Sequence, residues 1–513
     1  MTSVIQLREE DLWLSSLEDV HAFYAQSLSG SGTNAQTYGF EVELYALQQQ
    51  REYAGHLANA AQVECVLRDL QAADISATGA VYTLDLAQQL EFASAPRDSI
   101  TALYRHGQEA EKLLQKTTEH HGLRLSALPV HPSANWSDLD YLNHIDQELI
   151  SDERTELVIP NFQRCIDTAK QSYSAHDLLA TCGIHTTFAI ADKAALEETL
   201  TLVGAVTPLI AAANHASPFS HFDSTQNSAR EILWDASLTR SNDRFGLPAR
   251  LSGEVTLEDV VAHVINQPMW YGIDQHGRLH GLDSPFTFAD LIRNGGLYIN
   301  NNVFIAPTLE QYVNHSRTCY NSYRIKPTFT DNGIICLTEF RIPDGGSMSK
   351  AVMNVALIHG LTHGVEVRGQ FREILERYGL LDAKGSKQAH YEHNKNLQQQ
   401  LLRYGLHQAA LPHRGIAAIK VWQEIVNLAC RELLAKENTP EIYQVLRALQ
   451  ATTYASEANR HREALQRLDA DPNQLSKPHY ADKLDLVTGY AQFGERYELP
   501  PARVLYHQAG DGR

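Results

Sequence analysis

The chain has 513 residues, a length that suits about two to four domains or one large α/β unit with an added part. Its formal net charge is −18, and no basic run offsets that charge. Sequence-independent binding of nucleic acids and attachment to anionic membranes both depend on clustered Lys and Arg, so neither kind of partner is predicted. A hydrophobic share of 43% is typical of a globular protein with a buried core.

Targeting and redox signals are sparse. No stretch approaches about 18 consecutive apolar residues, and the first ten residues are polar, so the sequence predicts neither a membrane-spanning helix nor a signal peptide. None of the six cysteines forms a C-x-x-C pair, which argues against a zinc site and a dense disulfide framework. The expected location is the cytoplasm. One or two regulatory disulfides stay compatible with the sequence.

Short strands and helices alternate along the first part of the chain. The apolar pattern predicts helices over residues 12–29, 192–214 and from 347 past 359, the second capped by Asp192 and kinked at Pro208. Loops are predicted at 29–33 and 48–50. Strands are predicted over residues 38–44, 81–86, 90–93, 183–190, 323–329 and 334–342. Because these strands come from distant parts of the chain, we expect a mixed α/β (α+β) protein with a largely antiparallel sheet.

The pattern changes after Gly379. A polar, exposed segment is predicted over residues 384–396, and a second polar break over 469–477. Helices are predicted over residues 397–404, 416–434 and 440–468. We therefore expect a body of residues 1–380 followed by a helical C-terminal region of residues 381–513, which could cover the site, mediate a homodimer or do neither.

Two acids mark the first candidate site. Glu41 and Glu43 alternate with Phe40, Val42 and Leu44 in a predicted strand, so both carboxylates share one face. Adjacent carboxylates suit a hard divalent cation. The solvated face of a half-exposed strand gives the same alternation, and taken alone this pattern favours the solvated face.

Three further candidates carry little weight singly. Glu91 and His185 each lie in a predicted strand, where taken alone a solvated Glu and a structural His are the favoured interpretations. Arg230 follows an apolar helix and, taken alone, is better explained by an ordinary surface charge. His359 and His363 have the spacing of a zinc protease motif without its Glu, so we interpret them as core histidines. Phosphate-loop, serine-hydrolase and kinase signatures do not occur.

Two more predicted strands carry charges on one face. Arg324 shares a face with Lys326, and Glu339 shares one with Arg341. A surface salt bridge is one interpretation of Glu339 with Arg341. In the other interpretation, Glu339 binds a metal ion and the planar guanidinium of Arg341 binds phosphate. The combination favours the second reading, because unpaired carboxylates 4 Å apart repel by about 4 kcal/mol at an effective dielectric of about 20. Such a cluster is expected only with cations, as with Mg²⁺ and nucleotide phosphates.

These segments, in this order, resemble the glutamate–cysteine ligase family of the plant and proteobacterial type, which belongs to the carboxylate–amine ligases. The resemblance covers about residues 38–363. Gly39, Glu41 and Glu43 match the opening G-x-E-x-E of the family. The other matching segments are Gln88 to Pro96, His131-Pro132 with Trp136, Thr181-Cys182 with His185, Ser217-Pro218-Phe219, Ser228-Ala229-Arg230, Pro268 to Tyr271, Phe288 to Leu291, Arg324-Ile325-Lys326, and Glu339 to Gly346.

The resemblance implies a glutamine-synthetase-like fold, with a curved antiparallel sheet backed by helices, and a role for each matched position. The implied Mg²⁺ ligands are Glu41, Glu43, Glu91, His185 and Glu339. The implied contacts of ATP are Arg324, Lys326 and Arg341. The implied catalytic residues are Arg230, Arg341 and Glu91, with Arg230 placed at the acceptor or the acyl phosphate.

The implied activity is an ATP- and Mg²⁺-dependent ligation of L-glutamate to L-cysteine through a γ-glutamyl phosphate. The chain departs from the family pattern at Gln88, Ser94, Thr187 and Thr225, positions that the resemblance implies to be near the amino-acid pocket. A γ-glutamyl ligase for another amine therefore stays open. An inactive nucleotide-binding homologue and an amide hydrolase on the same scaffold are the remaining alternatives.

Overall fold

The computed structural model of the chain describes most residues between 12 and 454. The described ranges are 12–29, 37–48, 58–74, 79–85, 89–126, 128–130, 153–171, 173–179, 181–190, 192–217, 227–236, 243–282, 285–299, 302–330, 333–382, 384–412 and 414–454. The predicted loop at 29–33 lies almost wholly outside these ranges, as do Gln88, the His131 to Trp136 motif, Thr225 and everything after Tyr454.

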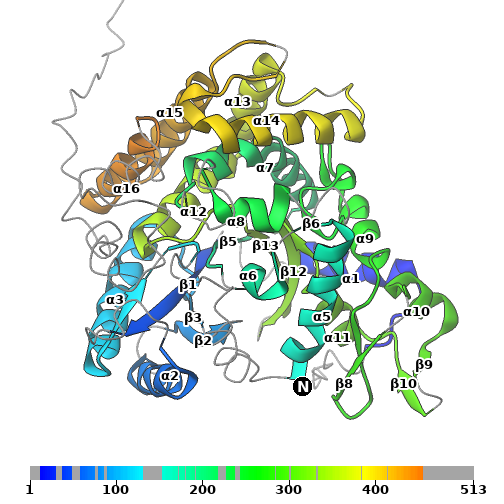
Figure 1. Cartoon of the computed structure of the whole chain (residues 1–513). Helices are drawn as coiled ribbons and strands as arrows, with labels where there is room; N and C mark the ends of the chain where they lie inside the picture. Colours follow the sequence, from blue (N-terminus) through cyan, green and yellow to red (C-terminus); the bar gives the residue numbers. More distant parts are fainter. Residues whose placement is uncertain are drawn as a thin grey trace, which may run out of the picture.

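A seven-stranded sheet of described residues lies at the centre of the molecule (Figure 1). Its order is β12-β13-β5-β1-β3-β2, with β4 paired to the far end of β1, and every pairing is antiparallel. The mixed α/β class with a largely antiparallel sheet is therefore confirmed. The strands are β1 (Tyr38–Gln48), β2 (Val81–Asp85), β3 (Gln89–Ala93), β4 (Leu123–Ser126), β5 (Ile184–Ala189), β12 (Tyr323–Thr330) and β13 (Gly333–Phe340).

The predicted strands match the observed ones closely, with one difference in β1. The prediction ended this strand at Leu44 and placed a loop from Gln48, whereas β1 continues to Gln48. The extension is held by β4, whose residue Leu123 is paired with Gln48. A partner strand so distant in the sequence leaves no trace in the local alternation, which explains the error.

One face of the sheet is apolar and covered by helices. Phe40, Val42, Phe92, Ile184 and Phe340 project from it, each at most 1% exposed. Burying a side chain of this size contributes roughly 1.5–3 kcal/mol. The helices that pack on the sheet include α12 (Met348–Thr362) on β1 and β5, α3 (Ile100–His120) on β1 and β4, and α1 (Leu17–Ser29) on β12 and β13.

Helix α1 begins five residues later than predicted. The backbone N–H of Leu14 donates to the carbonyl of Pro307, and the N–H of Leu309 donates to the carbonyl of Leu12. This pairing holds residues 12–14 extended. Long-range hydrogen bonds therefore replace the first helical turn that the apolar pattern suggested.

The long apolar helix α7 (Lys193–Ala213) lies in the core. Its cap is as predicted, because Oδ1 of Asp192 accepts from the N–H of Ala195 at 2.7 Å, and the helix continues through Pro208 to Ala213. Within the described part of the chain it is the one helix long and apolar enough to cross a membrane, but 78% of its most apolar stretch is buried inside the protein.

Helices of the C-terminal part lie along the top of the molecule in Figure 1. They are α13 (Val365–Tyr378), α14 (Lys387–Gln408), α15 (Ala418–Lys436) and α16 (Pro440–Ala451). The exposed polar segment predicted over 384–396 is wrong in part, because α14 starts within it and turns His390 and Asn394 inward. Leu397 and Trp422 belong to the same apolar cluster as the sheet, and a division at residue 380 stays a prediction.

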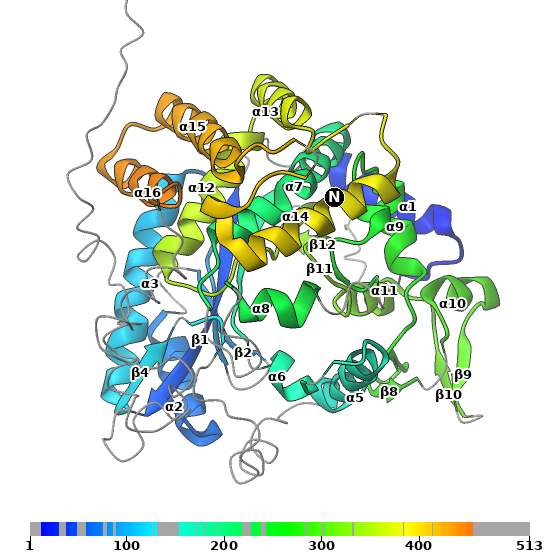
Figure 2. The same cartoon turned by 45° about the horizontal axis from the view of Figure 1, so that its top comes forward.

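The remaining elements surround the sheet, and several small ones lie together on the right of Figures 1 and 2. The helices are α2 (Ala60–Asp74), α5 (Glu153–Thr168), α6 (Ala175–Leu179), α8 (Ala229–Glu231), η3 (Ile232–Ala236), η4 (Ala249–Leu251), α9 (Leu257–Ile265), α10 (Phe288–Asn294) and α11 (Leu309–Ser316). The strand pairs are β6 (Phe245–Gly246) with β11 (Tyr320–Asn321), β7 (Tyr271–Ile273) with β8 (Leu279–Gly281), and β9 (Leu297–Ile299) with β10 (Val303–Ile305).

Candidate active site

The register of β1 places three acids and a histidine on one face of the sheet. Glu41 is paired with His185 on β5, and Glu43 is paired with Glu91 on β3. Paired residues of antiparallel strands project to the same face, with Cβ atoms about 4.5–5.5 Å apart. Four predicted ligands from three strands are therefore neighbours.

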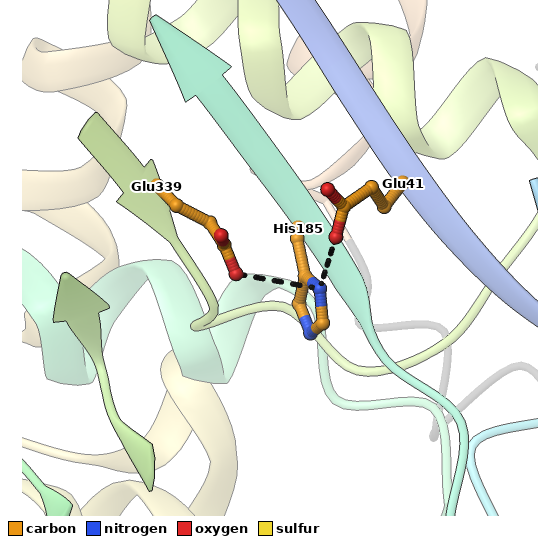
Figure 3. Close-up of side chains that lie close together, drawn as sticks. All are labelled: Glu41, His185 and Glu339. Atoms are coloured by element: carbon orange, nitrogen blue, oxygen red, sulfur yellow. Dashed lines mark hydrogen bonds and ion pairs between the residues drawn. The ribbon is translucent and has the colours of Figure 1, made fainter. Parts of the chain in front are cut away.

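Strand β13 adds a fourth acid, and a fifth predicted ligand, to this face. Glu339 is paired with Thr187 on β5 and with Arg324 on β12, and its side chain is fully buried. Figure 3 shows the side chains of Glu41, His185 and Glu339 pointing toward one another from adjacent strands. We call these three residues the Glu41–His185–Glu339 trio.

A cavity of about 470 Å³ lies over this face, within the range of volumes that hold small-molecule ligands. Its lining contains all of the predicted site residues except Glu339: Glu41, Glu43, Glu91, His185, Arg230, Arg324, Lys326 and Arg341. Glu339 lies directly beneath that lining, because Arg324 and His185 both contact it. The structure thus brings together every residue that the sequence nominated for the site.

The trio has the geometry of a cation site. One donor atom from each residue lies within 4.8 Å of the other two, and Nδ1 of His185 is 3.0 Å from Glu41 Oε2 and 3.6 Å from Glu339 Oε1. Two ligands of one divalent cation are at most about 5 Å apart, because each lies roughly 2.0–2.6 Å from the ion. Oε1 of Glu339 accepts no hydrogen bond from a described residue. A buried carboxylate oxygen that accepts no hydrogen bond is a suitable ligand for a cation, so the chemistry of these three residues fits a divalent cation site.

Three cationic side chains contact the same buried carboxylate. Nε of Arg324 is 2.9 Å from Glu339 Oε2, and Nε of Arg341 is 3.5 Å from Glu339 Oε1. The ammonium of Lys326 contacts Glu339 and lies 3.5 Å from Glu41 Oε1. We call Arg324, Lys326 and Arg341 the cation cluster, which offers an anion one ammonium and two guanidinium groups beside the trio.

The electrostatic environment divides the acids into two kinds. Burial raises the pKa of Glu339, but Arg324, Lys326 and their neighbours outweigh it and hold that pKa well below its usual value. Burial and the charge of Glu339 raise the pKa of Glu41, but Lys326 and His185 lower it by more, so that it falls to about 2. At Glu91, burial and the charge of Asp85 raise the pKa well above the usual range. The trio acids are thus held ionised, whereas Glu91 lacks enough positive charge around it.

Arg230 reaches the cavity across a glycine. A Cβ at Gly183, just before β5, would lie 2.5 Å from Nη2 of Arg230, so a side chain there would displace the guanidinium from this position. The N–H of Gly183 also donates to the carboxylate of Glu43. Gly183 therefore lets Arg230 pack against the strand that carries His185.

A buried carboxylate holds the backbone around Arg230. Asp344 is 3% exposed, and its Oδ2 accepts from the N–H of Ala216 at 3.0 Å and from the hydroxyl of Ser217 at 3.3 Å. The hydroxyl of Ser228 donates to both carboxylate oxygens. Ser217 Oγ in turn accepts from the N–H of Arg230 at 3.3 Å. Asp344 thus ties the turn after β13 to the short helix that carries Arg230.

Sequence reasoning missed several cavity residues. Asp85 follows Thr83 at a spacing of two in a predicted strand, and Glu231 follows Arg230 directly, so both had a local signal. Other polar or aromatic lining residues come from segments that carried no motif, among them Trp234, Arg317, Tyr320, Asn321 and Ser322. Ser94 and Thr187, the described departures from the family pattern, are not part of the lining. Ser94 instead accepts the N–H of Phe40 at 2.9 Å.

A cavity lined by carboxylates, a histidine and guanidinium groups on an antiparallel sheet suits an enzyme that handles phosphates with a cation. The model of the glutamate–cysteine ligase family 2 matches residues 37–468. The chain therefore belongs to this family, and it is an ATP-dependent carboxylate–amine ligase of the glutamate–cysteine ligase type. The resemblance found in the sequence is confirmed, and the antiparallel sheet backed by helices agrees with the fold that it implies. No curated protein matches the chain.

Two solved structures are similar to the chain at low identity. A glutamate–cysteine ligase from Francisella tularensis, in complex with AMP, is 15% identical with a TM-score of 0.46, and the match covers 91% of this chain and 90% of that one. A bifunctional glutathione synthetase from Pasteurella multocida is 12% identical with a TM-score of 0.44, and the match covers 91% of this chain and 53% of that one. The chain thus spans about half the length of the Pasteurella protein.

Proposed function

We propose that this ligase joins the γ-carboxylate of L-glutamate to an amine, with ATP and a divalent cation, through a γ-glutamyl phosphate. The observation that carries the proposal is the contact between the trio and the cation cluster in the wall of one cavity. Carboxylates for a metal and guanidinium groups for phosphate, side by side, suit phosphoryl transfer.

The trio would hold the cation, with Glu43 and Glu91 beside it as further oxygen ligands. A divalent ion bound there neutralises charge on the transferred phosphoryl group. Mg²⁺ is the first candidate, and the imidazole of His185 makes Mn²⁺ a second.

The cation cluster would hold the phosphates of ATP. Arg324 and Arg341 present planar forks that match phosphate oxygens, and Lys326 adds a point charge. Such a local positive patch is needed because the net charge of −18 repels ATP at long range. Arg230 would contact the acyl phosphate from the far side of Gly183.

No covalent enzyme intermediate is required. Cys182 lies next to the site, but it is fully buried, and this burial raises the pKa of its thiol well above the usual value. A thiol held in its protonated form is a poor nucleophile. The two-step route through an acyl phosphate needs only positioned charges.

L-cysteine is the first acceptor that we propose. A different amine is the second, because the lining includes the aromatic side chains of Trp234 and Tyr320, which would suit a larger apolar acceptor. A cytoplasmic location and a homodimer also stay predictions.

The test is release of ADP by the purified full chain with ATP, Mg²⁺ and L-glutamate, with and without L-cysteine, followed by mass analysis of the products. Cysteine-dependent ADP release with a γ-glutamylcysteine mass supports the first acceptor. Glutamate-dependent release without that product supports another amine. No release under any combination, with Glu339→Gln indistinguishable from wild type, would refute the proposal.

A further inference from the structure

A second polar group lies in the cavity lining, apart from the trio and the cation cluster. Glu231 is the last residue of α8, directly after Arg230, and it lines the cavity although it is only 8% exposed. Neither the metal site nor the ATP contacts proposed above use this carboxylate. Among the described residues, no lysine or arginine forms an ion pair with Glu231. Burying a carboxylate without such a partner costs free energy, so its position in the lining needs an explanation.

Two buried side chains hold Glu231 from behind. Nε2 of His215 contacts Glu231 Oε2, and Nε2 of Gln398 on α14 donates to Glu231 Oε1 at 2.8 Å. A carboxylate can only accept, so Nε2 of His215 carries the proton. His215 is 1% exposed, and its Nδ1 has no hydrogen-bond partner among the described residues. Buried as it is, His215 fixes the position of the Glu231 carboxylate from the side away from solvent.

Among the described residues, His215 and Gln398 each occupy one oxygen of the Glu231 carboxylate. Each carboxylate oxygen can accept about two hydrogen bonds, so acceptor capacity remains on both. Because Glu231 is part of the cavity lining, a ligand in the cavity can reach this carboxylate. The group that completes the pattern is a donor of hydrogen bonds, and a cationic donor would also balance the carboxylate charge.

The amine acceptor is such a donor. A primary amine is largely an ammonium ion at neutral pH, and an ammonium nitrogen has no electron pair with which to attack a carbonyl carbon. We propose that Glu231 binds the ammonium group of the acceptor and takes its proton, acting as the general base of the second step. This inference rests on the proposed function, because it needs the γ-glutamyl phosphate as the group attacked.

One ammonium proton passes to the carboxylate of Glu231, and the freed nitrogen electron pair forms a bond to the γ-carbonyl carbon. The bond from that carbon to the phosphate oxygen breaks, and phosphate leaves with the electron pair. A second nitrogen proton goes to the departing phosphate, which leaves a neutral amide. Arg230 and Glu231 are consecutive, so one short helix presents a cation to the phosphate and an anion to the ammonium group.

The test compares two acceptors in the Glu231→Gln variant. Hydroxylamine is largely uncharged at neutral pH and attacks acyl phosphates without a base, whereas L-cysteine and simple alkylamines must first lose a proton. With ATP, Mg²⁺ and L-glutamate, we expect E231Q to form the γ-glutamyl hydroxamate within about threefold of wild type. Amide formation with the ammonium acceptors should fall by at least about 10²-fold, the usual size of a general-base effect. The exposed Glu366→Gln is the matched control, expected to behave as wild type with both acceptors.

An equal loss of hydroxamate and amide in a folded E231Q would overturn the inference, because Glu231 would then serve the first step or the fold. Wild-type protein that forms hydroxamate but no amide with any ammonium acceptor would also contradict it. If circular dichroism shows that E231Q does not fold, Glu231→Asp takes its place. This variant withdraws the carboxylate by one methylene, so amide formation should again fall selectively, but by a smaller factor. Wild-type protein that releases no ADP with glutamate and hydroxylamine would refute the proposed function itself, which separates the two failures.

Discussion

Replacing Asp344 with Ala tests whether a buried hydrogen-bond network positions Arg230 for the reaction. The substitution removes an acceptor of the N–H of Ala216 and of the hydroxyls of Ser217 and Ser228. All of these groups are buried, so water cannot take the place of the carboxylate freely. The helix that begins at Ser228 would lose its link to the turn after β13.

The magnitude follows from the number of donors that lose the carboxylate. A buried donor left without its acceptor costs roughly 1–3 kcal/mol, so the loss of three such bonds should lower the free energy of unfolding by at least about 3 kcal/mol. A misplacement of Arg230 by about 1 Å can lower the rate by about 10²-fold. Asp344→Asn retains one oxygen acceptor, so it should lose about 1–2 kcal/mol and roughly 10-fold in rate.

The assay is urea unfolding together with kcat/KM for the formation of γ-glutamyl hydroxamate, with the exposed Asp98→Asn as the matched control. We expect D344A to be less stable and at least about 10²-fold slower, D344N to be intermediate and D98N to resemble wild type. If D344A loses stability but catalyses at the wild-type rate, the network supports the fold alone, and its positioning role is wrong.

Three further predictions follow from other parts of the molecule. Glu339→Gln should lower glutamate-dependent ADP release by at least about 10²-fold and weaken Mn²⁺ binding, measured by electron paramagnetic resonance; unchanged Mn²⁺ affinity would contradict the trio as the cation site. Burial lowers the pKa of His263 to about 4 and of His315 to about 3, so the unfolded chain, with pKa values near 6.5, takes up protons first as the pH falls. The free energy of unfolding should therefore decrease as the pH falls from about 6.5 toward about 4, and at about pH 5 each histidine should account for a loss of about 2 kcal/mol. Urea midpoints that do not change over this pH range would refute this prediction. Glu437→Ala removes the acceptor of the N–H groups of Ile100 and Thr101, and it should cost about 1–2 kcal/mol while kcat stays near wild type.

Much of the site was predictable because strand alternation is local. The pattern around Glu41 and Glu43 fixes the face of both side chains without any knowledge of the partner strands. The same holds for Arg324 with Lys326. Pairing is different: Glu43 is paired with Glu91, and Glu41 with His185 far along the chain, and no local pattern specifies which strands meet. The resemblance to a family supplied the order of the segments, and the register supplied the contacts.

The parts that sequence reasoning missed depend on long-range contacts. Gln398 was expected in a short helix of a separate C-terminal region, yet it reaches back to Glu231 inside the cavity. Asp344 belongs to a recognised motif, but its role comes from Ser217 and Ser228, which approach only in the folded chain. A burial pattern of this kind follows from packing between α7, α8 and α14, which periodicity within any one helix does not encode.

The most direct test of the account is the fate of oxygen-18 placed in the γ-carboxylate of L-glutamate. The labelled substrate is incubated with the full chain, ATP, Mg²⁺ and hydroxylamine, and the phosphate released is analysed by mass spectrometry or ³¹P NMR. The account predicts that one labelled oxygen passes to phosphate for each amide formed, because the carboxylate oxygen attacks the γ-phosphoryl group and leaves with it. Product formed with label-free phosphate, or with the label in AMP, would contradict the γ-glutamyl phosphate and with it the assigned roles of the trio and the cation cluster.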